Sequence, residues 1–146
     1  MLIAPNNAFT AHAVSLNPPT AENPNGYHRL IGGSVELGES HLDAIVREID
    51  EELGATVRDL SLLTTLENIF QMDGALGQEI VLLYTGRLDP LPALTNASLT
   101  ESDGSVAPVV WRPFHDEQES LPLYPSAAVA WAHRLVDRHP SESSGR

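Results

Sequence analysis

The sequence contains no cysteine among its 146 residues. Disulfide bonds, thiolate metal sites and a cysteine nucleophile are therefore excluded, and a reducing compartment fits the composition. Long apolar runs are also missing, because Pro5, Asn6 and Asn7 interrupt the first one and no segment approaches the roughly 20 apolar residues of a membrane helix. A signal peptide has Lys or Arg before its apolar region, and no Lys or Arg precedes the first apolar residues here. We therefore expect a soluble cytoplasmic protein.

Basic residues are scarce. Eight Lys and Arg stand against twenty Asp and Glu, which gives a formal net charge of −12. Such a chain repels nucleic acid backbones and anionic membranes at long range, so neither a polymeric nucleic acid nor a membrane is expected as a partner. A small phosphorylated molecule stays open, because divalent cations held by carboxylates reverse the local field.

The order of the predicted elements indicates a single α/β domain. A length of 146 residues is enough for one hydrophobic core. Strand-like composition predicts two short strands within residues 2–16 and further strands at 27–31, 60–70, 79–88 and 109–111. Helices are predicted at 40–53 and 125–136, with loops at 17–26 and 73–77 and an exposed connection at 90–108. We therefore expect one domain over residues 1–139, a mixed sheet covered by helices, and a disordered tail at 140–146.

Residues 40–53 carry the strongest helix signal in the sequence. Apolar residues recur there at the helical period, at Leu42, Ile45, Val46, Ile49 and Leu53. Asp43 follows Ser40 at the spacing of a capping box, and Gly54 is a typical left-handed helix stop. We expect the apolar stripe to pack on the sheet, with the charged residues turned away from it.

Glu48, Glu51 and Glu52 lie within five residues of this predicted helix. On a helix they share one face, where like charges repel one another unless a cation or a basic partner compensates them. Carboxylate oxygens suit Mg²⁺ or Mn²⁺, and such an ion polarises a phosphoryl oxygen and acidifies a bound water. The alternative is a solvated helix face with incidental ion pairs, such as Asp43 with Arg47. The glutamates alone do not decide between the two.

The spacing around the glutamates is more specific. From Gly33, five residues lead to Glu39 and seven more to Arg47 and Glu48, followed by Ile49, Glu51, Glu52, Gly54 and Ala55. This pattern resembles the Nudix box, G-x5-E-x7-R-E-U-x-E-E-x-G-U, in which U is an apolar residue. The resemblance implies a Nudix-like α/β/α sandwich with a mixed β-sheet and a catalytic loop-helix-loop. It also implies a Mg²⁺-dependent hydrolase that cleaves a phosphoanhydride in a nucleoside diphosphate linked to another group.

The resemblance also implies roles for the residues of the box. Glu48, Glu51 and Glu52 would bind Mg²⁺, with Mn²⁺ as a substitute, and the backbone carbonyl of Gly33 is a further candidate ligand. Members of the family differ in which carboxylate assists the water, so that role is left open among these glutamates and others outside the box. Arg47 would orient the carboxylates of the helix and pair with Glu39.

Outside the box, four residues are candidates for substrate binding, each with an ordinary alternative. Glu79 begins an apolar run where many Nudix members place a further acidic residue, but a solvent-exposed strand position is equally expected. Arg29 is a candidate for a substrate phosphate or else a surface ion pair. Tyr27 and Phe70 are candidates for stacking on a ring or else core residues. The six histidines show no zinc-ligand spacing.

Two departures from the family pattern affect the prediction. Ile31 stands where many Nudix enzymes have proline, which leaves the subfamily open. The first strand begins at Met1 and is short, so a homodimer is one way to complete a sheet edge. The loops that set specificity carry no readable pattern, and nucleoside triphosphates, dinucleoside polyphosphates, nucleotide sugars and ADP-ribose all stay open as substrates.

Two other functions compete with the enzyme. One is a Nudix-fold module that binds a nucleotide or protein without turnover. The other is an interaction protein whose acidic helix binds a basic partner. If position matters more than charge, Glu52→Gln is expected to remove most turnover, whereas Glu22→Gln, in the loop at 17–26, is expected to do little.

Overall fold

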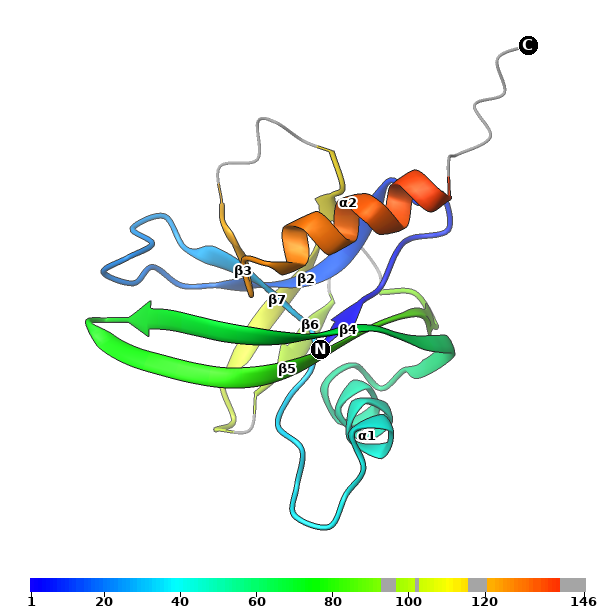
Figure 1. The fold of residues 1–146 in the computed structure, drawn as a ribbon, viewed down its shortest axis with the longest axis horizontal. Helices are drawn as coiled ribbons and strands as arrows, with labels where there is room; N and C mark the ends of the chain where they lie inside the picture. The colour runs from blue at the N-terminus through cyan, green and yellow to red at the C-terminus, as the bar shows by residue number, and fades with distance from the viewer. Residues whose placement is uncertain (93–96, 102, 116–120, 140–146) are drawn as a thin grey trace.

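The computed structural model describes residues 1–92, 97–101, 103–115 and 121–139. Eight strands and two helices lie in this part of the chain (Figure 1). In chain order they are β1 (Leu2–Ile3), β2 (Ala11–Asn17), β3 (Tyr27–Leu30), α1 (His41–Leu53), β4 (Thr56–Met72), β5 (Ala75–Asp89), β6 (Ser98–Thr100), β7 (Val106–Pro113), β8 (Leu123–Tyr124) and α2 (Ala128–Arg138). The predicted tail at 140–146 lies outside the described residues. Within the described ranges, no helix is long and apolar enough to cross a bilayer.

The strands form two mixed sheets, which confirms the predicted α/β class but divides the expected sheet in two. One sheet has the order β1-β5-β4 and the other β6-β7-β2-β3-β8. The pairs β1–β5 and β3–β8 are parallel, and the remaining pairs are antiparallel. A bridge between Leu2 and Ile31 joins the sheets, so the short first strand connects them rather than leaving a thin edge. The helices α1 and α2 lie on opposite sides of the sheets (Figure 1).

The β4–β5 hairpin is longer than predicted, and its loop is shorter. The expected loop at 73–77 consists of Asp73 and Gly74 alone, with φ of 49° and 80°. An Asp-Gly pair with both φ values positive is the favoured two-residue hairpin connection, so pairing continues up to it. The expected exposed connection at 90–108 was wrong in part, because β6 pairs there with β7 and Leu99 is 2% exposed. Residues 93–96 and 102 of that connection lie outside the described residues.

The ends of α1 are confirmed, but its buried face differs from the predicted stripe. The Oγ of Ser40 accepts a hydrogen bond from the backbone of Asp43 at 3.1 Å, and Gly54 adopts a φ of 61°. Leu42 and Val46, however, are 51% and 46% exposed. The buried residues of the helix are Ala44, Ile45 and Ile49. Ala44 is buried where the apolar periodicity predicted Leu42 and Val46. The helix is therefore rotated about its axis relative to the prediction, and part of its glutamate face turns toward the sheets.

A buried histidine between β2 and α2 has no compensating contact at one ring nitrogen. His12 is 1% exposed, and it stacks on Phe114 with ring centroids 4.9 Å apart. Its Nδ1 has no hydrogen-bond partner among the described residues. Burial, and then the positive charge of Arg112, lower the pKa of His12 to about 3. His12 is therefore neutral in the folded protein at neutral pH.

Acid is expected to destabilise the protein through His12. Between the usual histidine pKa of about 6.5 and the folded value of about 3, the unfolded chain binds a proton that the folded chain does not. The free energy of unfolding therefore falls as the pH is lowered through this range. His12→Phe removes this proton linkage, so the loss of Tm between neutral pH and about pH 4.5 should be smaller than in wild type. His41→Phe, at an exposed position, is the control; an equal reduction in both variants would contradict the prediction.

Candidate active site

The segment between β3 and α1 places Gly33 directly against a glutamate of the helix. Ile31 is bridged to Leu2, so the chain is tied to the sheets just before it turns toward α1. The carboxylate of Glu48 then packs on Gly33 so closely that an added Cβ would lie 2.5 Å from Oε2 and 2.6 Å from Oε1. A side chain at position 33 would therefore make the Glu48 carboxylate shift from this place.

Arg47 binds carboxylates on both sides of this loop. Its Nε and Nη2 donate to the two carboxylate oxygens of Glu39 at 2.7 and 2.9 Å, the bidentate geometry of a guanidinium fork. Its Nη1 donates to Glu48 at 2.9 Å and to Glu51 at 3.1 Å, while Nη2 also donates to the backbone carbonyl of Ser34 at 3.1 Å. The hydrogen bonds from Arg47 lower the pKa of Glu39 to about 2. Arg47 thus joins the helix to the loop that precedes it.

Glu52 turns inward, next to Glu48. Its Oε2 is buried and has no hydrogen-bond partner within the part of the chain that the structure describes. Burial, and then the neighbouring charge of Glu48, raise the pKa of Glu52 well above its usual range. A half-buried carboxylate with an unpartnered oxygen beside a second carboxylate holds its charge at a cost, which a bound cation would lower.

The pair of Glu48 and Glu52 fits a hard divalent cation. Two adjacent carboxylates, one with an unpartnered oxygen, lie next to the backbone of Gly33, and oxygen ligands of this kind are those that Mg²⁺ and Mn²⁺ prefer. Glu51 is placed differently, since its side chain is 57% exposed and is bound to Arg47. Among the described residues, no group of three carboxylates or imidazoles is arranged to hold a metal ion. The structure therefore brings Glu48 and Glu52 together and leaves Glu51 at the edge.

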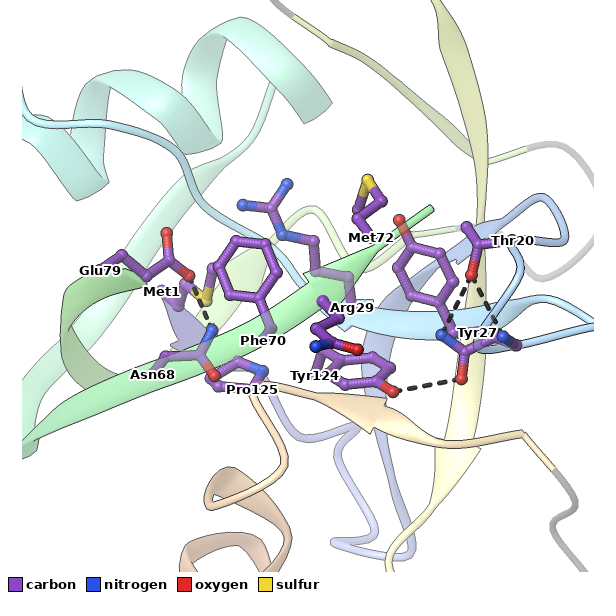
Figure 2. A pocket seen from close by; sticks show the side chains of 12 residues that line it. Met1, Thr20, Tyr27, Arg29, Asn68, Phe70, Met72, Glu79, Tyr124 and Pro125 are labelled. Carbon is purple, nitrogen blue, oxygen red and sulfur yellow. Dashed lines mark hydrogen bonds between the residues drawn. The ribbon is translucent and has the colours of Figure 1, made fainter. Parts of the chain in front are cut away.

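A cavity of about 290 Å³ brings together the four candidates from outside the box. Tyr27, Arg29, Phe70 and Glu79 all line it (Figure 2). Arg29 and Glu79 also line a second cavity, of about 250 Å³, which reaches Gly33 and the first turns of α1. We call the first cavity, with Tyr27 and Phe70, the ring-lined cavity. Arg29 and Glu79 therefore lie between it and the loop at Gly33. Neither the expected surface ion pair of Arg29 nor one of Glu79 is present among the described residues.

The aromatic rings of the first cavity are held by close packing. Tyr27 is 9% exposed and meets Tyr124 edge to face, with ring centroids 5.5 Å apart. Phe70 lies over Gly77 of the paired strand, where an added Cβ would overlap the ring. The two candidate rings come from different sheets, Tyr27 from β3 and Phe70 from β4. A planar ligand can pack against rings fixed in this way at little cost in side-chain entropy.

Several polar residues near the site were missed by the sequence analysis. Asn68 is 9% exposed and donates a hydrogen bond from Nδ2 to Oε1 of Glu79 at 3.0 Å. Asn23 accepts a hydrogen bond from the hydroxyl of Tyr124 at 3.1 Å. The charge of Glu101, just after β6, contributes to the raised pKa of Glu52. Strand alternation places Asn68 on the face of Phe70 and could have indicated it. No local pattern links Asn23 or Glu101 to the site.

Comparisons with known proteins agree with this architecture. A sequence model of the NUDIX domain matches residues 15–133. No curated protein matches the sequence significantly. The solution structure of the E. coli ORF135 protein is 19% identical, with a TM-score of 0.52, and the match covers 98% of this chain and 90% of that one. A structure from a study of MutT of Aliivibrio salmonicida and Vibrio cholerae is 20% identical, with a TM-score of 0.55 and 94% of each chain covered. Both solved structures share the fold.

Proposed function

Because this chain belongs to the Nudix family, we propose that it is a Mg²⁺-dependent hydrolase of a phosphoanhydride in a nucleoside diphosphate linked to another group. The observation that carries the proposal is the Glu48 and Glu52 pair, with its unpartnered buried oxygen, beside Gly33, whose cavity shares Arg29 and Glu79 with the ring-lined cavity. The oxygens of these two carboxylates would bind Mg²⁺, or Mn²⁺ as a substitute. The nearby cavity has the size and the aromatic lining that suit a small planar ligand.

Each element of the site has a proposed part in binding and catalysis. Glu48 and Glu52 would hold the cation, with Glu51 and the carbonyl of Gly33 as further ligands. A bound Mg²⁺ supplies a Lewis acid for a phosphate oxygen and lowers the pKa of a bound water. Arg47, through its bonds to Glu39 and Glu48, would keep the glutamates oriented.

The two cavities suggest how the substrate would lie. Tyr27 and Phe70 would hold the ring of the substrate. Arg29, which lines both cavities, would bind a phosphate on the path from the ring to the glutamates. Asn68 holds Glu79 at the same junction by a hydrogen bond. The negative charge of Glu79 would attract the cation and not the phosphate.

The proposal is tested by release of phosphate or pyrophosphate from nucleoside triphosphates, dinucleoside polyphosphates, nucleotide sugars and ADP-ribose. Each is assayed with Mg²⁺, with Mn²⁺ and with EDTA. Turnover of one class that requires the metal is the expected result, because the buried Oε2 of Glu52 has no hydrogen-bond partner among the described residues and would be completed by a cation. If a nucleotide raises the Tm of the folded protein but none of the substrates is hydrolysed, the proposal of a hydrolase is overturned and a nucleotide-binding module is favoured.

A further inference from the structure

The loop between β2 and β3 is tied to the tip of the β4–β5 hairpin by three hydrogen bonds. The carboxylate of Glu22 accepts one from the backbone N–H of Asp73 and one from that of Gly74, each at 2.9 Å. The carboxylate of Asp73 accepts one in return from the backbone N–H of Ala21 at 3.0 Å. We call these contacts of Ala21 and Glu22 with Asp73 and Gly74 the clasp. The clasp joins the two sheets, because the loop belongs to one and the hairpin to the other.

The clasp lies at the end of the ring-lined cavity away from the glutamates. Next to Glu22 in the loop, Asn23 and Thr20 line the cavity; next to Asp73 in the hairpin, Met72 lines it. Figure 2 shows Thr20 and Met72 on one side of the cavity and Glu79 on the other. Asn23 is itself fixed, since it accepts from Tyr124 and donates to Thr20 at 3.3 Å. The residues of the clasp are therefore the chain neighbours of residues that line the cavity.

The clasp depends on the two acceptor oxygens of the Glu22 carboxylate. With positive φ at both residues, the hairpin turn leaves the N–H groups of Asp73 and Gly74 unpaired within the hairpin and directed to one acceptor. Glu22 accepts both with its two oxygens, and these bonds lower its pKa. A Gln side chain has the same shape but only one acceptor oxygen. Glu22 is thus no neutral reference position, contrary to what its place in a loop suggested.

We propose that Glu22 is a positioning residue of the cavity: the clasp holds the two walls at the spacing that grips a planar ring, and ring binding and clasp formation stabilise each other. The inference rests on the proposed function in that the ring is taken to belong to a nucleotide. Because the clasp is exposed to solvent, it opens and closes readily, and a ligand that touches both walls favours the closed form. Since coupling between two sites is reciprocal, loss of the clasp weakens ring binding and ring binding protects the clasp.

Amide hydrogen exchange at Asp73 and Gly74 tests the clasp without any assay of activity. The probes are AMP, GMP, CMP and UMP, each added at a saturating concentration where it binds. In wild type, the nucleotide that binds is expected to slow exchange at these two amides by at least about fivefold, the lower end of the usual coupling between sites. Glu22→Gln should exchange faster without nucleotide and should bind that nucleotide about fivefold more weakly. Glu67→Gln, which alters an exposed carboxylate bonded to Gln78 in the same hairpin, should match wild type.

A steady-state assay separates a positioning role from loss of folding. With a substrate identified by the proposed hydrolysis assay, Glu22→Gln is expected to raise KM and leave kcat within about twofold, because the glutamates of α1 are not altered. Glu22→Ala should follow it, and both variants should keep the Tm of wild type within a few degrees. Nucleotide binding that leaves exchange at Asp73 and Gly74 unchanged, or equal affinity in wild type and Glu22→Gln, would overturn the inference while the hydrolase stands. If none of the four nucleotides binds and no substrate is turned over, the proposed function fails and the inference falls with it.

Discussion

Glu52→Gln is expected to lower kcat/KM on the order of 10³-fold, because it would remove one of the two proposed cation ligands, and metal catalysis supplies several kcal/mol at about 1.4 kcal/mol per tenfold. The change keeps the shape of the side chain, so the site should lose charge and not structure. Mg²⁺ titrations of activity and of Tm measure the effect, and the variant should show a weaker response in both. Turnover at the wild-type rate in Glu52→Gln would contradict the proposed role of Glu52 as a cation ligand.

The same variant is expected to be more stable than wild type when no metal is present. Glu52 is partly buried, its Oε2 lacks a partner, and Glu48 lies beside it, so a neutral amide removes an unfavourable charge. A higher Tm with EDTA together with lost activity is the trade that functional sites commonly show. Asp50→Asn is the matched control, since Asp50 is exposed on the same helix and should leave both activity and Tm near wild type. A lower Tm in Glu52→Gln would contradict the account of the buried carboxylate.

Arg47→Lys is expected to weaken metal binding or activity about 10- to 100-fold, the usual effect of removing a residue that orients metal ligands. Lysine keeps the positive charge but cannot reproduce the fork that binds both oxygens of Glu39 while also reaching Glu48 and Glu51. The apparent Mg²⁺ affinity, taken from the dependence of kcat/KM on Mg²⁺, is the measurement. A fall in Tm should accompany it, because the loop before α1 loses its anchor.

Arg58→Lys is the control for that substitution. Arg58 donates to Asp89 at 2.7 Å, but both side chains are more than half exposed, and surface pairs contribute little. Its replacement should leave the Mg²⁺ dependence of activity unchanged. If both arginine variants lose Mg²⁺ affinity to the same extent, the effect belongs to net charge, and the orienting role of Arg47 is refuted.

The part of the molecule that sequence reasoning predicted is the part governed by local patterns. The ends of α1 follow from Ser40 and Gly54, and the hairpin from an Asp-Gly pair between strand-like segments. The contact of Arg47 with Glu39 was likewise expected, as an implication of the resemblance to the Nudix box. Each of these features depends on residues close together in the chain. The metal and substrate roles of the site residues stay predictions.

The features that sequence reasoning missed depend on tertiary packing. The helix face was mistaken because periodicity cannot tell whether Ala44 or Leu42 meets the sheets. β6 escaped notice because a three-residue strand in a polar connection has no recognisable pattern. The clasp joins residues 51 and 52 positions apart, and the bond between Tyr124 and Asn23 spans 101 positions. Contacts over such separations are visible only once the two sheets have been placed.

The single guanidinium of Arg47 has a consequence for the order of folding and metal loading. Four carboxylates, Glu36, Glu39, Glu48 and Glu51, lie within 3.7 Å of it, so the acidic loop and helix already possess a resident counter-ion. Loading a divalent cation would then resemble ion exchange, in which Glu48 and Glu51 change partners while Glu39 keeps Arg47 in place. Small zinc domains fold only with their metal. Here Arg47 already joins the loop to the helix, so the proposed cation would be able to bind and leave without unfolding the chain.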